Sequence, residues 1–231
     1  MKNSLYLFLF LLVACQIQDA NQNNQEFYDD QKQTDSSASY YFLTQEERNE
    51  LRRSLFVPSL YKDYPLSCTL KTEYPTYYLG ELPRLDIKIY NQGKQDIYLI
   101  KCLDGSGFGR MPICKIDLVK PKKDSLAPLG RCGNINPLTI EDFQKIPTGS
   151  SFRPYGANYI FDYKLLNNDN FRQLGKYQVR FSYSTLSDTL MDYGGDINWS
   201  TNQDIENLKR LFSQVPRIEL ISNTIEFEII E

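Results

Sequence analysis

The sequence predicts a mainly β protein, an antiparallel β-sandwich with two short peripheral helices. Apolar and polar residues alternate along at least seven short segments after residue 65, which is typical of half-buried strands. Turn-forming residues separate these segments. Strands do not alternate with helices, and no Gly-x-Gly-x-x-Gly motif is present, so a nucleotide-binding α/β fold is disfavoured.

The composition limits the functions that fit this chain. Its 231 residues, 41% hydrophobic and 24% charged, are enough for one domain or two small ones. A formal net charge of −3 gives no basic surface for nucleic acid. The chain has no histidine, which excludes histidine acid–base catalysis, Ser-His-Asp nucleophiles and the usual zinc sites. We therefore expect a protein without enzymatic activity, metal or cofactor.

The N-terminus has the pattern of an export signal. A lysine precedes an apolar run over residues 5–13, about half of the ~20 residues that a membrane-spanning helix needs. The run ends in Leu12-Val13-Ala14-Cys15, which resembles the lipobox of bacterial lipoproteins. The resemblance implies that the signal peptide, residues 1–14, is removed and that Cys15 receives a diacylglyceryl group and acyl chains such as palmitate. Membrane lipid would then hold the protein on the bacterial cell envelope, facing the periplasm or the exterior.

Residues 15–39 are expected to form the lipidated cysteine and a disordered tether. The segment is rich in Gln, Asn, Asp and Ser and has too few apolar residues to bury a face. As a flexible coil it would have an r.m.s. span of roughly 25–30 Å. The folded domain is expected over residues 40–231.

Two helices are expected in this domain. The first covers about residues 45–55, where Thr44 and Glu47 fit a capping box. The second covers residues 202–213, in an insertion between strands, and has apolar residues at helical spacing. We expect its apolar stripe to pack on a sheet face or to cap one end of the sandwich, and a partner-binding groove is the alternative. The first helix carries arginines that we expect to be solvated, with contact to anionic lipid as the alternative: Arg48, Arg52 and Arg53.

The expected strands cover residues 66–71, 85–90, 97–103, 113–120, 159–166, 177–184 and 218–230. Tyr177 follows a tight turn at Gly175, the place of a tyrosine corner in immunoglobulin-like sandwiches. Together with the Pro-Thr-Gly-Ser turn at residues 147–150, this pattern resembles bacterial immunoglobulin-like domains over about residues 66–230. The resemblance implies the fold and no particular function.

Four cysteines remain after the lipidated one, in a compartment that can oxidise them: Cys68, Cys102, Cys114 and Cys132. Cys102 with Cys114 is the leading disulfide pair, because their parity places both side chains on one face of a hairpin closed by residues 105–111. Cys132 is a rival partner for either one. The alternative is that the cysteines are small buried residues with free thiols.

Polar loops offer neither a catalytic set nor a metal site. The glycine-rich loop at residues 104–110 lacks the Lys-Ser/Thr pair of a phosphate loop, so we expect a flexible hairpin. Another loop gathers oxygen ligands but misses the spacing of an EF-hand, so a polar loop is favoured over a calcium site: Asp188, Asp192, Asp196 and Asn198.

Three tyrosines in a proline-containing stretch either cover the core or are exposed to a protein or glycan: Tyr74, Tyr77 and Tyr78.

These observations favour a membrane-anchored envelope lipoprotein that acts as a non-enzymatic binding or assembly module, with an envelope protein or glycan as its partner. A protease inhibitor is the alternative, because bacterial immunoglobulin-like domains include a proteinase inhibitor with a similar strand pattern. A glycosidase that uses two carboxylates, with strand-borne Asp86 and Asp162 as candidates, has the least support.

Overall fold

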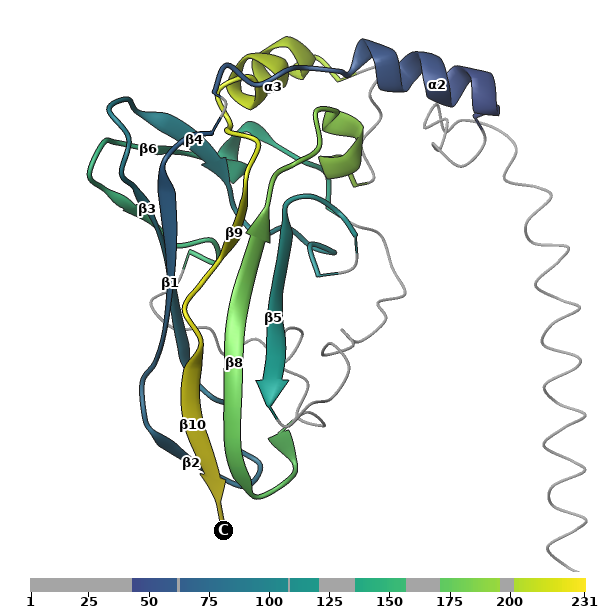
Figure 1. The fold of residues 1–231 in the computed structure, drawn as a ribbon. Helices are drawn as coiled ribbons and strands as arrows, with labels where there is room; N and C mark the ends of the chain where they lie inside the picture. Colours follow the sequence, from purple (N-terminus) through teal and green to yellow (C-terminus); the bar gives the residue numbers. More distant parts are fainter. Residues whose placement is uncertain (1–42, 62, 108, 121–135, 157–170, 196–201) are drawn as a thin grey trace, which may run out of the picture. The chain divides into compact units, whose positions relative to one another are not determined.

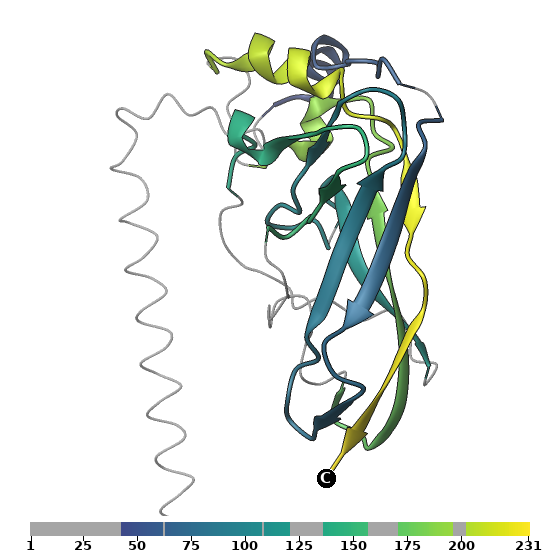
Figure 2. The same ribbon diagram turned by 90° about the vertical axis from the view of Figure 1, so that its left-hand side faces the viewer.

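The computed structural model describes residues 43–61, 63–107, 109–120, 136–156, 171–195 and 202–231. Two of the three β-sheets in these residues pack face to face, and the third is a small two-stranded sheet (Figure 1, Figure 2). The first sheet has the order β1-β3-β7, and the second has the order β2-β10-β8-β5, with β9 also paired to β8. The strands are β1 (Leu66–Thr72), β2 (Thr76–Tyr78), β3 (Leu85–Asn91), β5 (Ile113–Lys120), β7 (Ser151–Phe152), β8 (Gly175–Ser184), β9 (Glu219–Ile221) and β10 (Ile225–Ile230). The expected mainly β sandwich is confirmed.

All strand pairs are antiparallel except one. β2 runs parallel to β10, with Tyr77 in register with Ile229. The chain leaves β1 in the first sheet at Thr72 and enters β2 in the second sheet at Thr76. This crossing makes β2 an edge strand that continues the direction of β1 on the opposite sheet.

The main core lies between the two sheets and follows the alternation seen in the sequence. In β3 every second side chain is buried, beginning with Leu85. Buried residues of β5, β8 and β10 meet them from the second sheet, and the largest are aromatic: Tyr177, Phe181, Tyr183 and Phe227. Burial of these rings and of the facing aliphatic side chains is the main force that holds the two sheets together.

A second apolar cluster closes one end of the sandwich, and we call this region the cap. It consists of α2 (Gln45–Ser54), α3 (Ile205–Phe212), the 3₁₀ helices η2 (Ile140–Asp142) and η4 (Leu190–Tyr193), and the paired strands β4 (Ile97–Ile100) and β6 (Phe143–Ile146). The apolar stripe of α3 is buried here, as expected for a helix that caps the sandwich: Leu208, Leu211 and Phe212. Among the described residues, no helix is both long and apolar enough to cross a membrane.

Both predicted helices are confirmed, with small changes at their ends. The Thr44–Glu47 capping box forms in both directions at the start of α2. Every described residue belongs to one compact unit that covers residues 39–231. The signal peptide, the tether and the strand expected at residues 159–166 lie outside the described residues.

One predicted connection is wrong. Residues 97–103 and 113–120 were expected to form a hairpin, but β4, which ends at Ile100, pairs with β6, while β5 pairs with β8 in the second sheet. The loop between them is anchored, because Ser106 is buried and its carbonyl accepts a 3.1 Å hydrogen bond from the Cys114 N–H. The short strands β6 and β7 were not predicted, although the turn at residues 147–150 that separates them was.

The open edge of β1 is closed by a side chain. The Asn223 side-chain amide donates to the Leu70 carbonyl at 3.0 Å, and its oxygen accepts from the Leu70 N–H at 2.9 Å. Asn223 lies between β9 and β10, so this pair of bonds joins the two sheets along one side. An edge strand with its groups satisfied in this way is protected against pairing with another chain.

Candidate functional site

Among the described residues, two of the surface hollows lie at opposite ends of the sandwich. The first, the cap cleft, has a volume of about 640 Å³ and is lined by Asn49, Arg52, Arg53, Phe56, Ser187, Asp188 and Thr189. The second, the aromatic groove, has a volume of about 310 Å³ and is lined by Tyr74, Pro75, Thr76, Tyr77, Tyr78, Glu81 and Ile230. Figure 1 places α2, beside the cap cleft, at one end and β2, in the aromatic groove, at the other.

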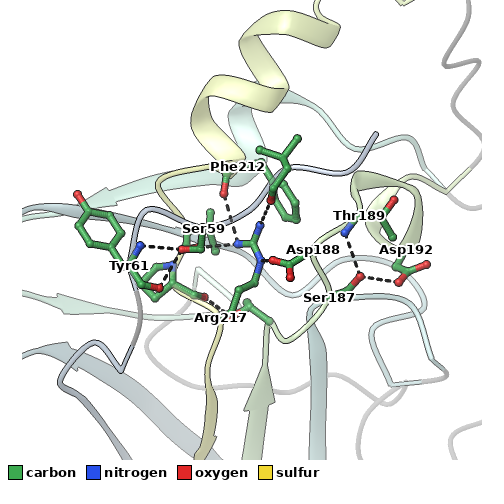
Figure 3. A network of polar contacts seen from close by, with 12 residues as sticks. Ser59, Tyr61, Ser187, Asp188, Thr189, Asp192, Phe212 and Arg217 are labelled. Atoms are coloured by element: carbon green, nitrogen blue, oxygen red, sulfur yellow. Dashed lines mark hydrogen bonds and ion pairs between the residues drawn. The ribbon is translucent and has the colours of Figure 1, made fainter. Parts of the chain in front are cut away.

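Arg217 joins separate segments of the cap (Figure 3). Its guanidinium donates to the Val57 carbonyl at 2.8 Å, to the Val215 carbonyl at 2.6 Å and to the Asp188 carboxylate at 2.9 Å. It also lies 3.9 Å from the ring centroid of Phe212. The side chain is only 10% exposed, and this burial lowers the pKa of Arg217. A buried cation with this many acceptors holds the cap together.

Several other polar groups around the cap cleft are also bonded within the protein, but the Arg53 side chain, which lines the cleft as well, forms no such bond among the described residues. Arg52 donates to both carboxylate oxygens of Asp192 at 2.9 Å. The Ser187 hydroxyl donates to the same carboxylate (Figure 3). Asp188 is held by Arg217. These bonds attach α2 to the loop and 3₁₀ helix at residues 187–193. The cap cleft is therefore the outer side of a structural joint.

Several large apolar side chains are exposed around the aromatic groove. Tyr78 is 58% exposed, Tyr74 47% and Ile230 36%. Tyr78 is in register with Ile230, and Thr76 is in register with Glu228, so these side chains share the outer face of the sheet edge. Exposed aromatic residues around a hollow are typical of contact sites.

Tyr77 fixes the shape of the aromatic groove from below. It is only 4% exposed, and its hydroxyl accepts from the Arg84 N–H at 3.0 Å and from the Tyr74 N–H at 3.2 Å. The same hydroxyl lies 2.7 Å from that of Thr72. Of the three tyrosines considered from the sequence, Tyr77 thus covers the core, whereas Tyr74 and Tyr78 are exposed. The buried ring holds the segment that carries the two exposed rings.

The edge of β2 beside the groove is blocked. Glu81 accepts a 2.8 Å hydrogen bond from the Tyr78 N–H through its side chain, and its own N–H donates to the Tyr78 carbonyl at 2.9 Å. These are the outward groups of Tyr78, because β10 contacts the chain at Pro75 and Leu79. A ligand that added a strand to this edge would have to break both bonds. The groove is therefore suited to side chains or rings.

The aromatic groove is electronegative. Glu81 lines it, and Glu228 lies next to Thr76 on the same outer face. The nearby Arg84 is committed to Glu73 through a 2.9 Å ion pair, and this hydrogen bond raises the pKa of Arg84. The guanidinium of Arg84 also lies 5.8 Å from the Tyr74 ring centroid, which is within the range of a cation–π contact.

Many tyrosines in this chain serve to brace the backbone. Four tyrosine hydroxyls each bind both the N–H and the carbonyl of one residue: Tyr64 with Gln95, Tyr77 with Arg84, Tyr177 with Gln173 and Tyr183 with Ile100. The Tyr177 bond confirms the expected tyrosine corner. Burial raises the pKa of Tyr183 well above its ordinary value. In the part of the chain that the structure describes, the hydroxyls of Tyr74 and Tyr78 make no such bond.

The cysteines divide into a bonded pair and a free residue. A disulfide joins Cys102 to Cys114, the pair that the sequence ranked first, with 6.0 Å between the Cα atoms. The expected geometry was wrong, because the bond connects the segment after β4 with β5 in another sheet and does not cross a hairpin. Cys68 is free and half-buried in β1, and burial raises its pKa to about 12. Cys15 and Cys132 lie outside the described residues.

Some of the aspartates that the sequence offers as calcium ligands or catalytic groups lie in the described residues, and each of these pairs with an arginine. Asp188 and Asp192 bind arginines of the cap, while Asp196 and Asn198 lie outside the described residues. Asp86 pairs with Arg153 at 3.2 Å, and Asp162 lies outside the described residues. Within the described ranges, no group of three or more acidic or cysteine side chains is placed to hold a metal ion.

Comparison with known proteins adds no relative: no family model matches the chain, and no curated protein matches its sequence.

Proposed function

We propose that this chain is a lipid-anchored protein of the bacterial cell envelope that binds a partner through the aromatic groove, without catalysis. The observation that carries the binding role is the pair of exposed rings, Tyr74 and Tyr78, beside the carboxylate of Glu81, which forms no ion pair among the described residues. Support for the anchor comes from the lipobox-like residues 12–15.

The position of the groove supports this proposal. The first described residues lead into α2 at the cap, so the expected tether joins the domain at that end. The aromatic groove lies at the opposite end, beside β2 and the end of β10 (Figure 1). A partner at the groove would therefore contact the folded domain at the end opposite the one where α2 begins.

The anchor is tested by changing Cys15. Cys15→Ser is expected to move the protein from the membrane fraction to the soluble fraction and to abolish labelling by a fatty-acid analogue. Continued labelling of that variant would contradict lipidation at Cys15, and continued membrane association without labelling would contradict the lipid as the anchor.

The binding role is tested by co-purification from detergent-extracted envelopes. The variant Tyr74→Ala/Tyr78→Ala is expected to lose the proteins that the unmodified chain retains. Phe56→Ala is the matched control, because Phe56 is 56% exposed at the cap cleft. Equal loss of partners in the control and the groove variant would contradict a role specific to the groove.

A further inference from the structure

Resting on this proposed function, we infer that the aromatic groove recognises a lysine- or arginine-bearing segment of its protein partner. Two features of the groove favour such a segment: the open ring of Tyr78, and the carboxylates of Glu81 and Glu228, which form no ion pair among the described residues. Each feature attracts a positive charge by a different physical mechanism.

The rings provide the first attraction. The face of a tyrosine ring carries negative charge density and binds ammonium and guanidinium groups. The protein already uses this contact beside the groove, where the Arg84 guanidinium lies over Tyr74. Among the described residues, no cation lies over the more exposed ring of Tyr78. This ring is open to a cation from a partner.

The carboxylates provide the second attraction. The Tyr78 N–H holds one oxygen of Glu81 in place, so the carboxylate is fixed beside the groove. Within the described part of the chain, neither Glu81 nor Glu228 forms an ion pair, whereas Glu73 and Glu226 do. The fixed carboxylate of Glu81 beside the open Tyr78 ring favours a cationic ligand and repels an anionic one. Glu228, which is in register with Thr76 and on its other side with Lys176, adds a second negative charge nearby.

The same features disfavour other ligands. An anionic lipid headgroup would face Glu81 and Glu228 at close range, which costs binding energy. A strand of a partner would meet the blocked edge at Tyr78. A groove of about 310 Å³ is large enough for a few side chains but not for a whole element. A short cationic segment meets each of these limits.

The test measures binding of a defined peptide to the full chain in a neutral detergent. The probe is hexalysine with both ends capped, followed by fluorescence anisotropy at low ionic strength. Hexaglutamate, chitohexaose and phosphatidylglycerol vesicles are measured in parallel. We expect hexalysine to bind, with weakening at high salt because the contacts are partly exposed, and we expect the other three probes not to bind.

Two groove variants separate the contributions. Tyr78→Ala is expected to weaken hexalysine binding about fivefold, in line with an exposed cation–π contact. Glu81→Gln keeps an acceptor for the Tyr78 N–H while removing the charge, and we expect it to weaken binding about threefold. The controls are Phe56→Ala and Glu206→Gln at the cap, which make the same kinds of change away from the groove and are expected to leave binding unchanged.

Three results would overturn the inference. One is hexalysine affinity that is equal in all variants. The second is chitohexaose binding that is lost in Tyr78→Ala and kept in Glu81→Gln, which would identify a glycan site. The third is vesicle binding that depends on Tyr78. If the groove variants lose their envelope partner but the unmodified chain does not bind hexalysine, the proposed function stands and the ligand class is wrong.

Discussion

The two ends of the sandwich both have a hollow and exposed apolar side chains, but they differ in how their charges are used. At the cap, Arg52 and Arg217 are paired with Asp192 and Asp188, and the bonds join segments far apart in the chain. At the aromatic groove, the carboxylate of Glu81 has no cationic partner among the described residues, and the nearest rings are open to solvent.

The volume of a hollow is therefore a poor guide to its role. The cap cleft has about twice the volume of the aromatic groove, 640 against 310 Å³. Its polar side chains, however, are bonded within the protein, apart from Arg53, which forms no side-chain bond among the described residues. Charged and aromatic groups without internal partners are the better sign of a binding site.

The largest expected effect on the free energy of unfolding comes from a change in the cap. Arg217→Ala removes the donor to three backbone carbonyls and the partner of Asp188. We expect a loss of about 3 kcal/mol in the free energy of unfolding, measured by urea denaturation, because buried acceptors lose their donor. Arg210→Ala, on the exposed side of α3, should change stability by less than about 0.5 kcal/mol. Similar stability of the two variants would contradict a structural role for the cap network.

The disulfide between Cys102 and Cys114 gives the next largest effect on stability. Removal by Cys102→Ala/Cys114→Ala opens a link with a sequence separation of 12, and we expect a loss of nearly 3 kcal/mol from the chain-entropy model. Cys68→Ala, which removes only a free thiol, is the matched control and should cost about 1 kcal/mol or less. Urea denaturation without reductant measures both. An equal cost for the two changes would rule out a bond that constrains the chain.

The next effect compares the stability change on removing a buried and an exposed tyrosine hydroxyl. Tyr183→Phe leaves the buried N–H and carbonyl of Ile100 without their partner, so we expect a loss of about 1–3 kcal/mol. Tyr78→Phe removes a hydroxyl with no partner among the described residues and should lie within about 0.5 kcal/mol of the unmodified protein. Thermal unfolding of the two variants is the measurement. If Tyr78→Phe were the more destabilised variant, the bracing role assigned to the buried tyrosines would be wrong.

The smallest effect at neutral pH concerns Cys68. Burial raises its pKa to about 12, so the folded state retains the thiol proton above the pH at which the unfolded state releases it. Its contribution to stability is complete below the pKa of the unfolded thiol and is lost as the pH rises toward about 12. At pH 8, iodoacetamide should modify Cys68 at least about 100-fold more slowly in the folded protein than in urea. Equal rates would show that the thiol is not buried.

Local patterns allowed much of the fold to be predicted. The capping box at Thr44 and the alternation in β3 depend on neighbouring residues, so they can be read directly from the chain. β6 and β7 were missed because they are short, with four and two residues, and are defined by pairing with distant β4 and β3. The disulfide pair was identified through a hairpin that does not exist, because parity shows which residues share a face but not which sheet contains them.

The candidate site was only partly predictable for the same reason. The sequence indicates that the three tyrosines either cover the core or are exposed. Only the register with β10 shows that Tyr77 faces the core and Tyr78 faces the solvent. Glu81 was missed because its role depends on a bond across a turn to Tyr78. The Arg217 network was missed because its acceptors come from residues 57, 188, 212 and 215, which become neighbours only on folding.

The central claim, that the groove binds a partner and the cap cleft does not, is tested most directly by photo-crosslinking in living cells. Benzoylphenylalanine is placed at Tyr78 in one variant and at Phe56 in another, since both positions carry exposed aromatic side chains. We predict that irradiation produces a discrete crosslinked protein from position 78 and none from position 56. Crosslinking from position 56 alone would contradict the claim and would assign the binding surface to the cap.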